Sequence, residues 1–139
     1  MRVYTRIVTP CLCTNLRLAT RRLSAAYDAA LAPLGINIGQ YFLLRTILER
    51  PSVSLTELGE RTELDRSTAG RNVRVLERMG LVETRRGTTD GREAVVVLTS
   101  AGHMLLDDAQ PLWASAQDAA AARLGPANLQ ALQTTLEAI

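Results

Sequence analysis

The sequence contains few of the residues that enzymes use for catalysis. Its 139 residues include one histidine, His103, and two cysteines, with neither a Gly-x-x-x-x-Gly-Lys loop nor a Gly-x-Gly-x-x-Gly turn. Enzymes need a nucleophile beside a base, a loop that holds phosphate or a set of metal ligands. None of these is evident, so we expect no enzyme, no cofactor and no metal site. Two cysteines are also too few for a disulfide framework.

Long apolar runs are also lacking. No run approaches the ~20 residues that span a membrane, and the N-terminus has no apolar signal segment followed by a small-residue cleavage site. We expect a soluble, cytoplasmic protein with no membrane partner. Hydrophobic residues make up 47% of the chain but aromatic residues only 4%, which predicts a core of mostly Leu, Val and Ala.

Lysine is absent, and all 16 basic residues are arginine. The formal net charge is only +2, but residues 66–92 hold seven arginines against three acids, whereas residues 100–139 hold one arginine against four. Arginine recognises phosphates and base edges through its planar fork, so the basic middle segment suggests a nucleic-acid partner. A GC-rich genome would give the same preference for arginine over lysine.

Apolar periodicity and turn residues predict the order of the elements. Helices are predicted over residues 10–32, 37–49, 54–62, 66–79, 100–125 and 126–139, and strands over 82–86 and 94–98. Predicted helix ends include Thr9 as an N-cap before Pro10, Asp65 as an N-cap, and Gly80 at a C-terminus. The fold class is therefore mainly α with a small β-hairpin wing, in which long helices flank a compact core.

The predicted helix 66–79 has two contrasting faces. One face is apolar and suits packing on the preceding helix: Ala69, Val73 and Leu76. The polar residues on or beside the opposite face are Ser67, Thr68, Arg71, Asn72, Arg74 and Arg78. Arg71 and Asn72 are predicted to bind base edges in a major groove, and Ser67 and Thr68 to bind phosphates at the helix start. A merely solvated arginine face is the alternative.

The predicted hairpin carries arginine on both sides of its turn. Arg85 and Arg86 precede the turn and Arg92 follows it. A narrow minor groove attracts inserted arginine, so Arg92 is predicted to enter it, with Asp90 holding its guanidinium. A short helix, a three-residue break, an arginine-faced helix and this hairpin form the winged helix-turn-helix. A winged helix used only for protein contacts would not need these arginines.

The segment from Leu55 to Gly102 resembles the winged helix-turn-helix core of the MarR family of bacterial transcription regulators. The matching features are Leu-x-x-Leu-Gly at 55–59, Leu-x-x-x-Gly-Leu-Val at 76–82, Asp-Gly-Arg at 90–92 and Leu-Thr-x-x-Gly at 98–102. The resemblance implies a single chain, 1–139, in which residues 36–99 bind double-stranded DNA and residues 1–35 and 100–139 form a homodimer. Two recognition helices would then read a pseudo-palindromic operator, more often as a repressor than as an activator.

The two cysteines, Cys11 and Cys13, are close neighbours in the sequence. Residues i and i+2 point about 200° apart on a helix, so they are not expected to bond each other or to hold one metal together. Cys13 lies near the positive end of the first predicted helix and four residues before Arg17, and both features favour a thiolate. Three interpretations remain: an oxidant-sensing thiol, inert packing, and a metal or metalloid site completed by a dimer partner.

The first helix also resembles that of the organic hydroperoxide sensors of the MarR family, the OhrR type. These sensors carry a reactive cysteine followed 14 residues later by a tyrosine that hydrogen-bonds it, a spacing that Cys13 and Tyr27 match. Ile38 and Arg17 occupy the positions of two further sensor tyrosines, Gly39 that of a proline, and Cys11 has no counterpart. The resemblance implies release from DNA when Cys13 is oxidised. The alternative is a regulator of this type that responds to a small molecule or a metal ion.

Overall fold

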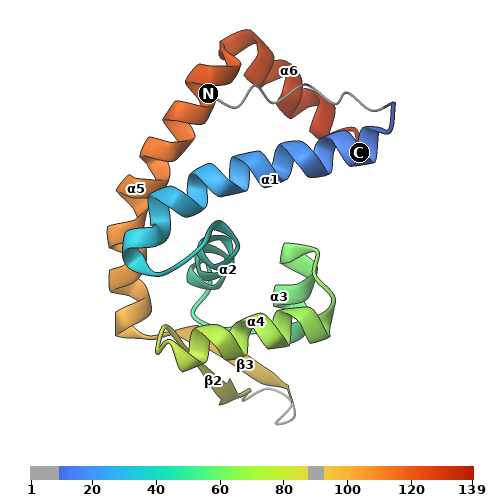
Figure 1. The fold of residues 1–139 in the computed structure, drawn as a ribbon. Coiled ribbons are helices and arrows are strands. Elements are labelled where there is room, and N and C mark those ends of the chain that lie inside the picture. Colours follow the sequence, from blue (N-terminus) through green and yellow to red (C-terminus); the bar gives the residue numbers. More distant parts are fainter. Residues whose placement is uncertain (1–9, 88–92) are drawn as a thin grey trace.

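The computed structural model describes residues 10–87 and 93–139, and within them the chain is mainly helical. The elements in chain order are α1 (Leu12–Leu31), η1 (Ala32–Leu34), α2 (Ile38–Leu48), β1 (Val53–Ser54), α3 (Leu55–Thr62), α4 (Arg66–Arg78), β2 (Val82–Arg86), β3 (Ala94–Leu98), α5 (Ser100–Leu124) and α6 (Pro126–Leu136). Figure 1 shows a winged lobe, made of α2 to α4 and the strands, beside a frame of α1, α5 and α6. The predicted fold class is confirmed.

Helix α4 begins after the N-cap that the sequence predicts, Asp65, and α5 begins after a similar N-cap, Thr99. Asp65 accepts a hydrogen bond from the N–H of Thr68 at 2.8 Å, and Thr99 accepts one from Gly102 at 3.0 Å. The first helix is an exception, because its N-cap is Cys11 and not Thr9, which lies outside the described residues. The first intrahelical bond runs from Asn15 N–H to the Cys11 carbonyl, so helical geometry starts after Cys11. The last helix ends at Leu136 instead of continuing to Ile139.

The strands form one antiparallel sheet in the order β1-β3-β2. The hairpin pairs Val82 with Leu98 and Arg86 with Ala94, and both strands have the predicted bounds. The third strand, β1, pairs Val53 with Val96 and was not predicted. Two residues are too few to show the alternation by which a strand is recognised in a sequence.

The core lies where the winged lobe meets α5 and the end of α1. Its largest fully buried side chains are Leu31, Leu44, Ile47, Leu58, Leu76, Val53, Val82 and Val96. The ring centroids of Tyr41 and Trp113 lie 5.9 Å apart in a stacked arrangement, which joins α2 to α5. Aliphatic residues thus dominate the core, as predicted, with isoleucine contributing as well.

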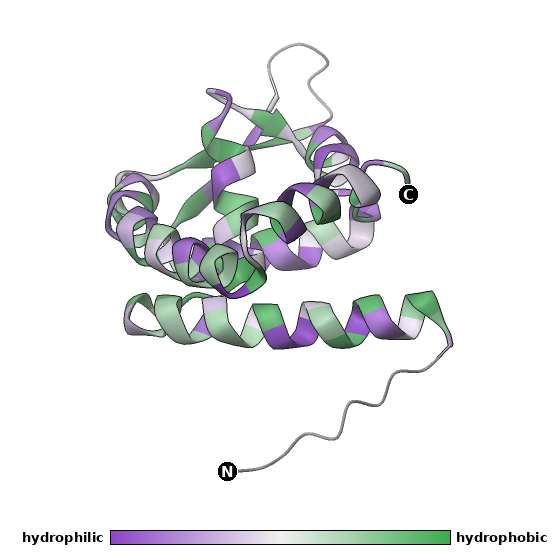
Figure 2. Cartoon of the chain, turned by 90° about the horizontal axis from the view of Figure 1, so that it is seen from above, coloured by the Kyte–Doolittle hydropathy of each residue, from purple (hydrophilic) through white to green (hydrophobic). Residues whose placement is uncertain are grey.

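The frame helices are much less buried than the winged lobe. No residue of α6 is buried, and Leu12, Leu16 and Leu23 on α1 are 78%, 40% and 40% exposed. In Figure 2 apolar residues, in green, recur along the length of α1. None of the described helices combines the length and apolar character that crossing a membrane requires. An uncovered apolar surface therefore extends over the frame.

Candidate nucleic-acid interface

The two faces of α4 differ in burial as predicted. Ala69, Val73 and Leu76 are 0%, 2% and 0% exposed. Thr68 is half-buried, and the other polar residues of the opposite side are exposed: Ser67, Arg71, Asn72, Arg74 and Arg78. None of these three arginines forms an ion pair with a described residue. The outer side of α4 therefore presents three guanidinium groups and a carboxamide to solvent or to a partner.

The carboxylate of Asp65 organises the first turn of α4. Its Oδ1 accepts hydrogen bonds from the Ser67 hydroxyl at 2.6 Å and from the Thr68 N–H at 2.8 Å, and its Oδ2 accepts one from the Thr68 hydroxyl at 2.8 Å. These donors, with the Ser67 hydroxyl contributing most, hold the pKa of the Asp65 carboxyl far below its usual range. A negative charge of the chain itself therefore already lies at the start of α4.

This arrangement bears on the predicted phosphate contacts of Ser67 and Thr68. Both hydroxyl protons point to Asp65 and are not directed outward. A phosphate oxygen only accepts hydrogen bonds, so a hydroxyl must leave Asp65 before it can donate to one. The phosphate roles of the two residues stay predictions. The Thr68 oxygen instead accepts a hydrogen bond of 3.0 Å from the guanidinium of Arg71.

The wing, which is the hairpin of β2 and β3, exposes two of the predicted arginines. Arg85 and Arg86 are both exposed, and Arg85 forms an ion pair of 2.9 Å with Glu83. Asp90 and Arg92 lie outside the described residues, so their roles in a minor groove stay predictions. Arg85 and Arg86 therefore add positive charge to the same lobe as α4.

Glu93 connects the base of the wing to α3, which the sequence did not indicate. Its carbonyl accepts a hydrogen bond of 2.9 Å from Gly87 N–H, which closes the hairpin. The pairing of β1 with β3 brings the chain before Ala94 beside the start of α3. There the Thr56 hydroxyl, and to a lesser extent that of Ser54, lowers the pKa of the Glu93 carboxyl. The contact depends on β1, so no spacing in the sequence reveals it.

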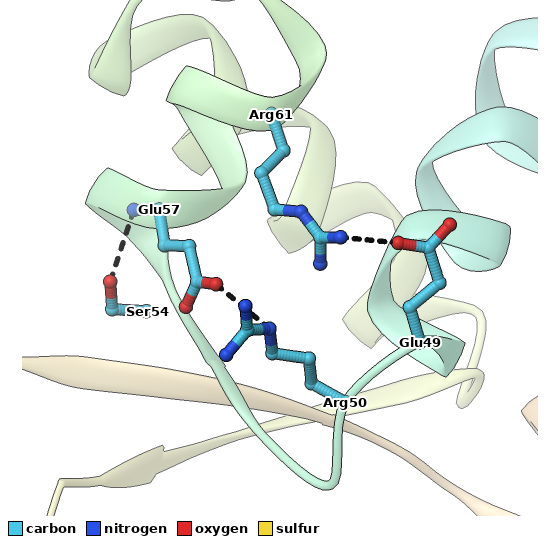
Figure 3. A network of polar contacts seen from close by, with 5 residues as sticks. All are labelled: Glu49, Arg50, Ser54, Glu57 and Arg61. Atoms are coloured by element: carbon cyan, nitrogen blue, oxygen red, sulfur yellow. Dashed lines mark hydrogen bonds and ion pairs between the residues drawn. The ribbon is translucent and has the colours of Figure 1, made fainter.

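Two ion pairs join the end of α2 to α3 (Figure 3). Arg50 Nε lies 3.1 Å from a carboxylate oxygen of Glu57, and Arg61 pairs with Glu49. The backbone N–H of Glu57 also donates to the Ser54 hydroxyl at 3.0 Å. Exposed pairs of this kind contribute about 0.2–1 kcal/mol each. They help to set the orientation of α3, on which α4 packs.

The position of Cys11 at the start of α1 lowers the pKa of its thiol. The Thr14 side chain, followed by the N–H groups of Thr14 and Cys13, favours the thiolate of Cys11. Helix α1 begins two residues later than predicted, so Cys11 is its N-cap, and Cys13 lies within the first turn of the helix as predicted. Both thiols are exposed and neither is in a disulfide.

Tyr27 is not beside Cys13 within one chain. Its hydroxyl donates a hydrogen bond to the side-chain oxygen of Gln117 on α5. Fourteen helical residues separate Tyr27 from Cys13, which corresponds to about 21 Å along α1. Only a second copy of the chain can bring the two side chains together. Among the described residues, no group of three potential ligands could hold a metal ion.

Two of the surface cavities among the described residues lie beside functionally interesting surfaces. One, of about 330 Å³, lies between α2, α3 and α4, and Phe42 and Asn72 are among its lining residues. The other, of about 420 Å³, lies between α1 and α5 and is lined mostly by alanines and leucines, including Leu23, together with Arg22 and Arg123. The first cavity adjoins a predicted base-reading residue, and the second belongs to the uncovered apolar surface of the frame.

Comparisons with known proteins agree with this geometry. Residues 34–93 match the model of the MarR family. The organic hydroperoxide resistance transcriptional regulator of Bacillus subtilis (strain 168) is 29% identical over 98 residues, which are 70% of this chain and 67% of that protein.

Solved structures of transcription regulators resemble more than nine tenths of the chain. The transcriptional regulator MosR of M. tuberculosis in complex with DNA is 34% identical, with a TM-score of 0.76, and the match covers 92% of this chain and 97% of that one. A mutant E. coli MarR complexed with operator DNA has a TM-score of 0.85 at 20% identity, covering 91% of each chain.

Proposed function

The chain belongs to the MarR family of DNA-binding transcription regulators, and we propose that it is a homodimeric repressor that reads a pseudo-palindromic operator. In this proposal Arg71 and Asn72 contact base edges in the major groove. Arg74 and Arg78, with Arg85 on the wing, bind the phosphate backbone, and Arg92 enters the minor groove beside it. The observation that carries the proposal is the exposed arginine face of α4, set directly opposite the face that is buried in the core.

The frame supports the dimer. A helix of 11 residues without a buried side chain is marginal in water by itself, yet α6 is such a helix. The exposed leucines of α1 and the alanine-lined groove between α1 and α5 offer a largely apolar surface that a second copy of the frame would cover. A two-fold dimer would present two α4 helices to one DNA duplex, which is why the operator is expected to be pseudo-palindromic.

In vitro selection tests this proposal. A library of duplexes with a randomised 30-base-pair centre is incubated with the full chain, and the bound duplexes are recovered and sequenced. The proposal predicts two inverted half-sites with centres about 10 base pairs, or a multiple of this, apart. Recovery of duplexes without any shared sequence would contradict it, as would a single half-site bound by a monomer.

A thiol switch is the first candidate for the signal. The environment of Cys11 favours its thiolate, and both Cys11 and Cys13 are exposed to solvent. Attack of either thiolate on a hydroperoxide forms an S–O bond and breaks the O–O bond, which leaves a sulfenic acid and an alkoxide that takes up a proton as alcohol. A tyrosine partner such as Tyr27 would have to come from the second copy.

Single cysteine variants test the switch. DNA binding of wild type, Cys11→Ser and Cys13→Ser is measured by fluorescence anisotropy before and after cumene hydroperoxide, and again after dithiothreitol. Reversible release that one of the two variants has lost identifies the sensing thiol. If all three proteins stay bound, the thiol switch is wrong and the cysteines only pack.

A small-molecule effector is the second candidate, and the cavity between α2, α3 and α4 favours it. Its volume of about 330 Å³ suits a small ligand, and its wall combines the exposed ring of Phe42 with the carboxamide of Asn72. A ligand there would compete for a base-reading side chain. The aromatic probe 1-anilinonaphthalene-8-sulfonate tests the site: its fluorescence should rise with wild type and much less with Phe42→Arg. An equal rise with both proteins would exclude binding in this cavity.

A further inference from the structure

A chain of hydrogen bonds runs along the first two turns of α4, from Asp65 through Thr68 to Arg71. Asp65 Oδ2 accepts the Thr68 hydroxyl proton at 2.8 Å, and the Thr68 oxygen accepts a hydrogen bond of 3.0 Å from a terminal nitrogen of Arg71. Oδ1 of Asp65 accepts a hydrogen bond of 2.8 Å from the Thr68 backbone N–H, so both the main chain and the side chain of Thr68 are fixed. The contacts follow the i, i+3 spacing of neighbours on a helix surface.

We propose that Asp65 and Thr68 are positioning residues that determine base specificity by holding the guanidinium of Arg71 ready for its base pair. The proposal rests on the proposed function, in which Arg71 reads a base. A guanidinium has five N–H donors in a rigid fork, and the bond to Thr68 uses one terminal nitrogen. Four N–H donors of Arg71 therefore remain for a base edge. Ordering a long side chain before binding removes part of the entropic cost of recognition.

The hydroxyl of Thr68 is well suited to this task. A hydroxyl that donates to a carboxylate is polarised and becomes a better acceptor for the next donor in the chain. Arg74 and Arg78 lie on the same side of α4, yet among the described residues no side chain restrains either of them by a hydrogen bond or an ion pair. Of the three arginines on this face, Arg71 alone is held in this way by the described part of the chain.

The charge of Asp65 makes the proposal testable, because two accounts predict different effects on DNA binding when this charge is removed. A carboxylate at the end of a DNA-reading helix repels phosphates, so a purely electrostatic account predicts that its neutralisation tightens binding to every duplex. The positioning account predicts a loss of discrimination between base pairs. Asp65→Asn separates the two accounts, because asparagine is an equally good N-cap. Its amide nitrogen cannot accept the Thr68 hydroxyl proton that Oδ2 accepts.

The experiment uses the duplex that the wild-type full chain selects from a randomised library, together with all single-base-pair variants of it. Arg71→Ala first identifies the base pair at which discrimination depends on Arg71. Wild type should prefer the correct pair there by about 5- to 150-fold. Thr68→Val keeps the shape and removes the hydroxyl, and Thr68→Ser is the matched control that keeps it. Thermal unfolding midpoints of all variants report on the fold.

Thr68→Val and Asp65→Asn are expected to lower the preference at that one base pair by about fivefold or more, whereas Thr68→Ser retains it. In the double variant Arg71→Ala/Thr68→Val, loss of the hydroxyl should change nothing further at that position. If Thr68→Val discriminates as well as wild type, or if Asp65→Asn only tightens binding to all duplexes, the proposal is overturned. If wild type selects no preferred sequence at all, the proposed function itself fails.

Discussion

A Cβ atom on Gly102 would lie only 2.2 Å from the carbonyl oxygen of Leu81. The start of α5 thus packs directly against the turn that leads from α4 into the wing. The Thr99 hydroxyl reinforces this contact by donating a hydrogen bond of 2.6 Å to the carbonyl of Gly80. The Leu-Thr-x-x-Gly sequence at 98–102 therefore allows the frame to pack closely against the winged lobe.

Gly102→Ala should destabilise the fold, because the clash involves backbone on both sides and cannot be relieved by rotating a side chain. We expect a loss of about 1–3 kcal/mol in the free energy of unfolding, the usual range for overpacking. Urea denaturation followed by circular dichroism measures it. An unchanged midpoint would show that α5 does not approach Leu81 this closely.

Gly70→Ala should have the opposite effect. Gly70 lies in the interior of α4, and an added Cβ would meet only the Arg74 side chain, at 3.8 Å. Alanine is favoured over glycine in a helix interior by about 0.5–1 kcal/mol. The same urea titration should give a higher midpoint than wild type. A lower midpoint would mean that the surroundings of Gly70 are tighter than the structure shows.

Leu23→Glu should dissociate the proposed dimer. Leu23 is 40% exposed in one chain and borders the groove between α1 and α5, where a second copy would bury the new charge. Light scattering coupled to size exclusion should report a monomer, with lost helicity as α6 unfolds. Met104→Glu is the control, because it places the same charge on an exposed apolar residue of α5 outside that groove. If Leu23→Glu stays dimeric, the interface lies elsewhere.

Arg92→Ala should weaken operator binding several-fold, because it removes the predicted minor-groove contact. Anisotropy titrations at fixed salt compare it with wild type, and Arg45→Ala serves as a control for the loss of one exposed positive charge on α2, outside both the wing and the groove between α1 and α5. An unchanged dissociation constant would contradict a contact between Arg92 and DNA.

Glu93 should make stability depend on acidic pH. Hydrogen bonds from Thr56 and Ser54 lower the pKa of its carboxyl in the folded chain. A carboxyl with a lowered pKa stabilises the fold above its unfolded value of about 4.3, and this stabilisation is lost as the pH falls through the folded pKa. The unfolding midpoint of wild type should exceed that of Glu93→Gln at pH 7, and the two should converge below about pH 4. A difference that does not change with pH would exclude an ionised Glu93 from the contact.

The features that were predicted correctly depend on residues close together in the sequence. The strands of the wing have the predicted bounds because their β-rich runs are separated by turn residues, and α4 begins where Asp65 provides an N-cap. The apolar and polar faces of α4 follow directly from the helical period. Such features depend on residues that are neighbours in the sequence.

The contacts that were missed depend on tertiary structure. Strand β1 exists because β3 offers it a partner, and Glu93 reaches α3 only through that pairing. The chain from Asp65 to Arg71 lies within one helix, but it depends on the rotamers of three side chains, which spacing does not specify. The lowered pKa of the Cys11 thiol follows from its position as the N-cap of α1, which begins two residues later than predicted. Helix ends are the least predictable part of an element.

The central claim is that the arginine face of α4 reads DNA, and the salt dependence of binding tests it most directly. Anisotropy of the selected duplex and of a scrambled duplex is measured from 50 to 300 mM KCl for wild type and Arg74→Ala. The account predicts a wild-type preference for the selected duplex of about 10³-fold or more, with a salt slope that falls by about one unit in Arg74→Ala while the dimer persists. Equal affinity for both duplexes, or a salt slope that Arg74→Ala leaves unchanged, would contradict it.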